Sequence, residues 1–477
     1  MQETHSFSKV TTVGPNEFWR AEFPSPAPAP GWVEYSIAAN GTALVDRSDR
    51  GAWKFYVPGA EEEPVIAYAS CNGFSSAKLV RDTNRPYLFW ERMAERQRGK
   101  PAENGNPAEP PRPFSLLLMG GDQVYADEIW ESRKCPNLKK WSLLSWGKQH
   151  KAKVSAALAA EIVKFYDELY LDRWHDPDMS LMFASIPSVM MWDDHDIFDG
   201  WGSYPEERQN CDVFQAVFKE AARVFDVFQL RCGTRNRLNA AGTHRTLRLR
   251  FGKYHLLILD NRSERTQTQI MSEENWVDTK NWLAELRREK IPNLLVMTGV
   301  PVVYRSFAAL EAIMDATLWH EELEDDVHDH WSSRPHLAER MRLIMVLLEF
   351  LRFQKDEVTG KCACKGVLIS GDVHVGAVAQ IWNEREELGL TQIISSGIVH
   401  PPPTAFAWAG IMLMTSDARE LLGDGDIETE VLTPIGSPRY LRTRNFATLR
   451  TGTDQKIWIN WVCEDERLAP NFAISTT

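Results

Sequence analysis

Cysteine is scarce in this sequence, and the few that occur are spread out. The 477 residues hold seven cysteines, at positions 71, 135, 211, 232, 362, 364 and 463. An odd number scattered over so long a chain excludes the framework of a small disulfide-rich protein, so we expect reduced thiols. Cys362 and Cys364 have no partner C-x-x-C, which predicts a surface pair of thiols rather than a metal clip.

Long apolar runs are also missing. No stretch of about 18 apolar residues occurs, so no membrane-spanning helix is predicted. The first residues, MQETHSFSKVTTVGPNEFW, lack a basic start followed by an apolar segment, so no export signal is predicted either. We therefore expect a cytoplasmic protein without a membrane partner.

Basic residues are outnumbered by acidic ones. The chain has 54 Lys and Arg against 66 Asp and Glu, a formal net charge of -12. Nucleic acids and anionic membranes attract basic surfaces, so we expect neither as a stable partner. A small anionic substrate remains compatible with this charge, because bound metal ions can reverse its local sign.

The residues that are present indicate a large α/β protein. Hydrophobic residues make up 43% of the chain, enough for a sizeable core. Residues 1–60 predict a small β-rich lead-in, with a Pro/Ala stretch at 24–32 and a hairpin over 32–45 that turns at Asn40-Gly41. Residues 61–477 form the predicted main domain, with its core motifs in 64–400 and closing strands in 401–477.

Within the main domain, apolar runs alternate with helical patterns. Continuous Val/Ile/Leu/Met runs of this kind are typical of strands covered on both faces, and their alternation with helices predicts an α/β sheet core. The predicted strands lie in 65–73, 114–127, 180–196, 246–262, 293–303 and 365–377, with a late strand at 455–464, and the predicted helices are 86–98, 153–174, 211–230, 275–290 and 336–356.

Four of the apolar runs end in residues that can bind metals. They end at Cys71, at Asp122, at Asp193-Asp194-His195, and at Asp372-Val373-His374. Ligands of open α/β sheets bind beyond the carboxyl ends of the strands, so these groups are expected to converge. Clustered carboxylates need a positive partner, and this inventory is that of a two-metal site for phosphoryl transfer. A glycine before Asp122 and before Asp372 permits a sharp turn and close approach to a ligand.

Each of these residues also has a simpler interpretation. Cys71 taken alone could be a thiol packed in the core, and each aspartate taken alone could be a solvated turn residue. His195 could be a structural residue that caps the start of a helix. The joint occurrence of the four groups favours the metal site. Asp193 and Asp199 stay unassigned. Arg262 and Arg265 either hold a phosphate or pair with nearby acids.

One further segment is rich in acidic residues and histidine but is not assigned to a metal site. WHEELEDDVHDHW (319–331) holds three His and six acidic residues, and we expect a solvated face or a lid there rather than another metal site.

Four motifs carry a resemblance to a known family. ASCN (69–72), GGDQVYAD (120–127), MWDDHD (191–196) and SGDVH (370–374), in this order, resemble the alkaline phosphatase D (PhoD-like) branch of the calcineurin-like metallophosphoesterases. Supporting matches are LLILDNRSER (256–265), TGVPVV (298–303), Asp329–Trp331 with Glu339-Arg340, and IISSGI (393–398).

The resemblance implies a fold and a set of ligands. The fold is a four-layer α/β/β/α sandwich, with the metals at one edge of the paired sheets. One metal, Fe³⁺ in the family, is then held by Cys71, Asp122, Tyr125 and His374. A second, Ca²⁺, is held by Asp122, Asp194 and Asp372. Mn²⁺, Mg²⁺ and Zn²⁺ are alternatives.

The same resemblance implies hydrolysis of a small-molecule phosphate ester. The expected mechanism uses a metal-bound hydroxide as nucleophile and His195 as the proton donor to the leaving group, with Asp196 orienting His195. Arg262 is the expected catalytic arginine, and Arg262 and Arg265 together are the expected phosphate-binding pair. Two alternatives stay open, namely a phosphodiesterase for nucleotide or lipid-type diesters and a catalytically silent scaffold.

Overall fold

The computed structural model describes residues 3–24, 29–99, 112–131, 133–231, 233–305, 331–416 and 419–476. The strands described within the first sixty residues pair with one another and form three two-stranded sheets. The turn at Asn40-Gly41 joins the two shortest strands, whereas the strand that begins at Gly31 pairs with 53–57. The strands are β1 (Ser8–Val13), β2 (Asn16–Arg20), β3 (Gly31–Tyr35), β4 (Ala38–Ala39), β5 (Thr42–Ala43) and β6 (Trp53–Val57).

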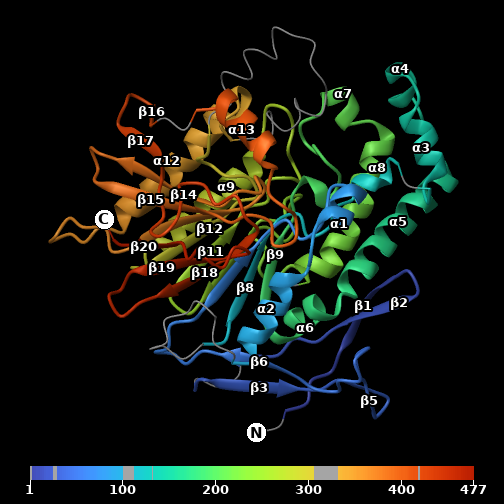
Figure 1. The fold of residues 1–477 in the computed structure, drawn as a ribbon, viewed down its shortest axis with the longest axis horizontal. Helices are drawn as coiled ribbons and strands as arrows, with labels where there is room; N and C mark the ends of the chain where they lie inside the picture. The colour runs from blue at the N-terminus through green and yellow to red at the C-terminus, as the bar shows by residue number, and fades with distance from the viewer. Residues whose placement is uncertain are drawn as a thin grey trace.

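Two larger mixed sheets form the centre of the molecule (Figure 1). The six-stranded sheet has the order β20-β19-β18-β7-β8-β9, in which β7, β8 and β9 are parallel. Its strands are β7 (Ile66–Ala69), β8 (Leu116–Gly120), β9 (Ser188–Met191), β18 (Asn445–Thr451), β19 (Ile457–Cys463) and β20 (Asn471–Ile474).

The eight-stranded sheet has the order β10-β11-β12-β13-β15-β14-β17-β16. Its central strands β11, β12, β13 and β15 are parallel to one another. Its strands are β10 (Leu247–Phe251), β11 (Tyr254–Ile258), β12 (Asn293–Met297), β13 (Lys365–Ser370), β14 (Ala377–Asn383), β15 (Leu388–Ile394), β16 (Glu420–Leu422) and β17 (Ile427–Leu432).

Helices surround the two sheets (Figure 1). On the chain they are α1 (Ala77–Asp82), α2 (Leu88–Gln97), α3 (Pro136–Ser142), α4 (Trp146–Gln149), α5 (Ala156–Trp174), α6 (Pro177–Ser185), α7 (Glu206–Gln209), α8 (Asp212–Phe225), α9 (Glu273–Leu286), α12 (Leu337–Phe353) and α13 (Ala405–Met414). Short single-turn helices are η1 (Asp127–Ile129), η2 (Asp194–Asp196), η3 (Asp226–Leu230) and η4 (Arg334–His336).

The alternation of side chains along β7 shows how the layers stack. Ile66 and Tyr68 belong to the largest core, which also holds Leu256 and Val367 of the other sheet. The side chains between them, such as Ala67, face a separate core that includes residues of α2 and α6. Residues of α9 and α12 share a third core with the outer face of the eight-stranded sheet. Successive strand residues point to opposite faces, so this arrangement is the predicted four-layer α/β/β/α sandwich.

Three details of the sequence prediction are wrong. The run 246–262 is not one strand but the antiparallel pair β10 and β11. The run 180–196 is not one strand, because α6 occupies its first part and Pro187 separates that helix from β9. Asp176 caps α6 by accepting a hydrogen bond from the Met179 amide at 2.9 Å, and Pro177 occupies its first turn. Cys362 and Cys364 are not at the surface, because both thiols pack into the core beneath α12.

The six described cysteines are free thiols, and Cys232 lies outside the described residues. Within the described ranges, every helix is too short or too polar to cross a bilayer. The acidic segment 319–331 falls outside the described residues except for Trp331, so its predicted role as a solvated face or lid stays a prediction.

Candidate metal centre

The loops that follow β7, β8 and β13 meet at one edge of the two sheets. The Cys71 amide donates to the Gly121 carbonyl at 3.2 Å, and the Asn72 amide donates to the Asp122 carbonyl at 2.7 Å. A parallel bridge between Ser70 and Gly397 joins the two sheets at this edge. The predicted convergence of strand ends 300 residues apart therefore exists in the fold.

The backbone at this edge adopts a conformation that L-residues rarely use. Cys71, Asp122, Asp372 and His374 have φ of 49°, 53°, 66° and 52°, in the left-handed region. Gly121 itself has φ of 99°, and a Cβ on it would lie 2.8 Å from the Cβ of Asp193. The turn before Asp122 thus needs glycine, as the sequence predicts. Non-glycine residues in this region cluster at functional sites, because the strain must be supported by the surrounding structure.

The side chains predicted to bind the first metal lie around Asp122. The Cys71 thiol is 3.7 Å from Asp122 Oδ2 and 3.9 Å from the Asp372 carbonyl oxygen. Three buried atoms of this group, Asp122 Oδ1, the Tyr125 hydroxyl and His374 Nδ1, have no hydrogen-bond partner.

A buried polar atom left without a partner costs about 1–3 kcal/mol. All three atoms carry lone pairs that a cation can accept. A thiolate, a phenolate and an imidazole suit a transition metal or trivalent ion, so the residues present fit the predicted first metal.

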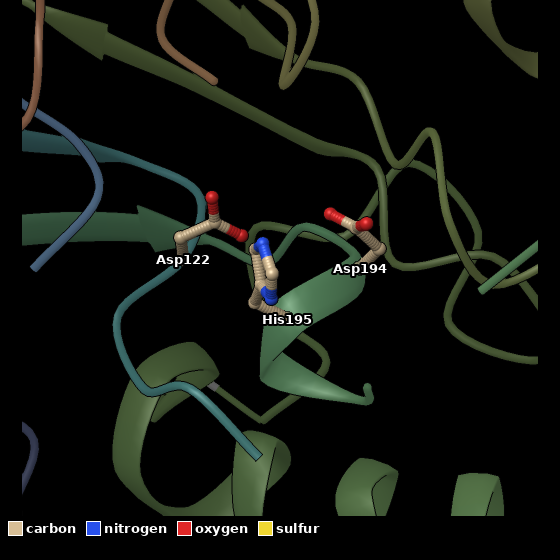
Figure 2. Close-up of side chains that lie close together, drawn as sticks. All are labelled: Asp122, Asp194 and His195. Carbon is tan, nitrogen blue, oxygen red and sulfur yellow. The ribbon is translucent and has the colours of Figure 1, made fainter. Parts of the chain in front are cut away.

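The carboxylates predicted to hold the second metal are gathered beside the first group. Figure 2 shows the carboxylates of Asp122 and Asp194 turned toward each other, with the His195 ring between them. One potential ligand atom each from Asp122, Asp194 and His195 lies within 4.8 Å of the others. The same holds for Asp193, Asp194 and Asp372, so Asp194 is common to both groups. Oxygen-rich sets of this kind suit Ca²⁺, Mg²⁺ or Mn²⁺.

Burial of so many acidic groups makes the site electrostatically costly without a cation. Burial raises the pKa of Asp122 well above its usual range, and Asp194 and Asp193 raise it further against the opposing effect of His195. Burial also raises the pKa values of the Cys71 thiol and the Tyr125 hydroxyl, with added repulsion from Asp122. Ionised carboxylate, thiolate and phenolate groups therefore need a positive ion among them.

His195 is held by a carboxylate that the sequence did not single out. Its Nδ1 lies 2.9 and 3.0 Å from the two carboxylate oxygens of Asp127. Burial lowers the pKa of His195, but Asp127 and Asp194 outweigh this effect, so the pKa lies well above its usual value. Asp127 Oδ1 also accepts the Asp199 amide at 2.9 Å. Asp127 thus fixes the imidazole and the following loop together.

The expectation that Asp196 orients His195 is wrong in this structure. Asp196 is completely buried and its carboxylate receives amide hydrogen bonds from Gln123 at 3.0 Å, Val124 at 3.1 Å and Asp193 at 2.9 Å. The Gln229 side chain adds a fourth at 2.8 Å. Asp196 therefore joins the loops after β8 and β9, while Asp127 performs the predicted orienting role.

The two arginines are also placed differently from the expected phosphate clamp. The Arg262 guanidinium is fully buried and donates to Asp193, to the Trp201 carbonyl at 3.2 Å and to Asp194 at 3.4 Å. Arg265 is buried as well, with its side-chain carbons packed against Gly202. The open alternative of pairing with nearby acids thus describes Arg262, which offsets the charge of Asp193.

One more residue at the site escaped the sequence analysis. His400 follows the IISSGI motif, and its ring stacks on His374 with centroids 3.8 Å apart and planes 13° apart. The signal for it was weak, because a lone histidine before three prolines has no metal-ligand spacing. Asp127, in contrast, stands at the end of GGDQVYAD, and its pairing with His195 across 68 residues is visible only in the fold.

Comparisons with known proteins find similarity to one family over part of this chain. A sequence model described as "PhoD related phosphatase" matches residues 112–321, which confirms the predicted resemblance. An uncharacterised protein of Saccharomyces cerevisiae is 26% identical over 449 residues, which cover 76% of this chain and 60% of the yeast protein. The chain therefore spans less than two thirds of that relative.

Two solved structures are similar to this chain. The structure titled "Structure of PhoD" superposes with a TM-score of 0.53 at 14% identity, over 90% of this chain and 75% of that one. The structure of a purple acid phosphatase from yellow lupin (Lupinus luteus) seeds superposes with a TM-score of 0.43 at 10% identity, over 89% of this chain and 56% of that one. The likeness to PhoD confirms the predicted metallophosphoesterase fold.

Proposed function

We propose that this chain, whose residues 112–321 match the PhoD-related phosphatases, is a metal-dependent phosphoester hydrolase of small molecules. The observations that support the proposal are two groups of potential metal ligands, Asp122 with Asp194 and His195, and Asp193 with Asp194 and Asp372, and the Cys71 thiol 3.7 Å from Asp122. Asp122 Oδ1, the Tyr125 hydroxyl and His374 Nδ1 are also buried without a hydrogen-bond partner among the described residues. Such atoms are expected where a metal is to be bound.

The donor set divides into two metal sites. Cys71, Asp122, Tyr125 and His374 would hold the first ion, of which Fe³⁺ is the proposed identity, and Asp122, Asp194 and Asp372 would hold Ca²⁺ or another hard dication. When bound, two such ions activate a water for attack on phosphorus and stabilise the charge of the transition state.

The protein's own part in the reaction is positioning and proton transfer. Asp127 holds the Nδ1 side of the His195 imidazole, which leaves Nε2 as the nitrogen able to give a proton to the departing oxygen. Arg262 pairs with Asp193 and so offsets one negative charge beside the carboxylates that would hold the second ion.

Metal analysis tests the site directly. Purified wild-type protein is compared with Cys71→Ser by elemental analysis, and Cys463→Ser, a buried thiol on β19, serves as the matched control. We expect Cys71→Ser to lose one metal and keep the other, while Cys463→Ser keeps both. Unchanged metal content in Cys71→Ser would remove this residue from the site.

Activity tests separate the enzyme from a silent scaffold. The metal-loaded protein is assayed with 4-nitrophenyl phosphate and with bis(4-nitrophenyl) phosphate. Hydrolysis of the monoester supports a phosphatase and hydrolysis of the diester supports a phosphodiesterase. If neither ester is hydrolysed by protein that has bound its metals, the enzymatic proposal fails.

One observation favours the diesterase alternative with a lipid-type substrate. Helix α13 begins shortly after His400 and has the sequence AFAWAGIMLM, without a charged residue. Phe406 is 92% and Leu413 88% exposed. An apolar surface on the helix that follows His400 along the chain suits the acyl chains of a lipid phosphodiester. A Phe406→Ser, Leu413→Ser double variant should lose activity on a lipid diester and keep it on the nitrophenyl diester.

The proposed location is the cytoplasm, where thiols such as the six free cysteines remain reduced. Tagging the chain at either end and following it by fractionation tests this part of the proposal.

A further inference from the structure

His400 contacts three of the residues assigned to the first metal, although it is not needed as a ligand. Its amide donates to the Cys71 carbonyl at 3.1 Å. Its ring stacks on His374, and it lies 5.5 Å from the Tyr125 ring at an angle of 19°. Tyr125 in turn packs on His195 with centroids 4.4 Å apart. Four rings thus form a continuous stack with His400 between two proposed ligands.

The ring nitrogens of His400 are both engaged away from the site. Nδ1 lies 2.9 Å from the Pro401 carbonyl oxygen, which can only accept, so Nδ1 must carry the proton. Nε2 lies 3.2 Å from the Ser75 hydroxyl. Both ring nitrogens therefore have partners outside the proposed set of metal ligands. The contacts of both nitrogens prevent the ring from turning, so its flat face stays parallel to His374.

We propose that His400 is a positioning residue, a flat aromatic ring that fixes the ring planes of His374 and Tyr125 for the first metal. The inference rests on the proposed function, since it takes these two residues as ligands. Partners that orient metal ligands typically change metal affinity by about 10- to 100-fold when they are removed. The shape of the ring, and not its nitrogens, is what this role requires.

The test uses the full chain stripped of metal and titrated with Co²⁺, whose visible absorption reports thiolate and imidazole coordination. Four proteins are compared, namely wild type, His400→Ala, His400→Phe and Ser75→Ala. We expect His400→Ala to bind Co²⁺ about 10- to 100-fold more weakly, because His374 and Tyr125 lose the surface that orients them. His400→Phe keeps the flat ring and should keep the wild-type affinity and spectrum. Ser75→Ala should weaken binding less than His400→Ala.

Two controls make the outcomes separable. Circular dichroism checks that each variant is folded, and Mn²⁺ binding, followed by electron paramagnetic resonance, reports the carboxylate set of Asp194 and Asp372, which His400 does not contact in the described structure. Equal loss of Co²⁺ affinity in the Phe and Ala variants would make His400 a ligand and overturn the inference. Unchanged affinity in the Ala variant would overturn it too. A wild-type protein that binds no Co²⁺ would refute the proposed metal site itself, which is a different result.

Discussion

The contact between Asp127 and His195 gives the most direct prediction about catalysis. In Asp127→Asn the side chain keeps its size, and its remaining oxygen can still accept the Asp199 amide. The new amide group, however, presents hydrogens to His195 Nδ1, where the carboxylate accepted one. The imidazole then loses the negative charge that stabilises its protonated form, so the pKa of His195 falls and less of it is in the form that can give a proton from Nε2 to the leaving group.

The expected magnitude follows from the type of contact that is lost. A hydrogen bond that involves a charged partner is worth about 1.5–3 kcal/mol. Because about 1.36 kcal/mol corresponds to a tenfold change in rate, kcat should fall about 10- to 100-fold. Complete removal of the proton donor in His195→Ala should cost more, about 10²- to 10⁴-fold.

The assay compares two leaving groups, since only a poor one needs a proton. Steady-state kinetics with an alkyl phosphate should show the full loss in Asp127→Asn, whereas 4-nitrophenyl phosphate should show a smaller loss with KM unchanged. Asp199→Asn is the matched control, because the Asp199 carboxylate is half exposed and 4.0 Å from His195 Nε2. Equal losses for both leaving groups, or a larger effect of Asp199→Asn, would refute the assignment of Asp127.

Three further variants test the network around the site. Asp196→Ala leaves several buried amide donors without an acceptor and should lower the free energy of unfolding by about 3 kcal/mol or more, measured by urea denaturation. Arg262→Met leaves Asp193 buried without its counter-charge and should cost about 3–5 kcal/mol, and Asp193→Asn in the same protein should recover part of the loss. Full stability of Arg262→Met would contradict the inferred neutralisation. Removal of metal from wild type by a chelator should abolish hydrolysis, and a metal-free protein with full activity would exclude the proposed mechanism.

The positions of the proposed ligands could be predicted because each follows a local pattern. An apolar run in the sequence indicates a buried strand. The polar residues that follow the run must lie at the carboxyl end of that strand, independently of the rest of the fold. Parallel strands put these ends on the same edge of a sheet. Cys71 and Asp122 satisfy both conditions within the six-stranded sheet. Asp372 follows β13 of the other sheet, so its place beside them also depends on how the two sheets pack, which the strand pattern alone does not give.

The partners of these residues could not be predicted in the same way. Asp127 and Asp196 are both aspartates close to His195 or Asp122 along the chain, and the sequence offers nothing to show which carboxylate turns to the imidazole. Which carboxylate contacts His195 depends on η2, because its tight turn directs Asp196 back toward the amides of Gln123 and Val124. Arg262 was ambiguous for the same reason, because its partner Asp193 is 69 residues away.

The backbone offers a separate argument that this site exists to bind cations. A non-glycine L-residue in the left-handed region costs about 1–2 kcal/mol, and four of the proposed metal ligands share that conformation. Two of the same residues, Asp122 and His374, also carry buried atoms without hydrogen-bond partners. Exposed turns of this chain, such as the one at Asn40, also use this conformation, but their polar groups can reach water. At Asp122 and His374 the strained conformation coincides with a buried unpartnered atom, as the proposed metal site would require.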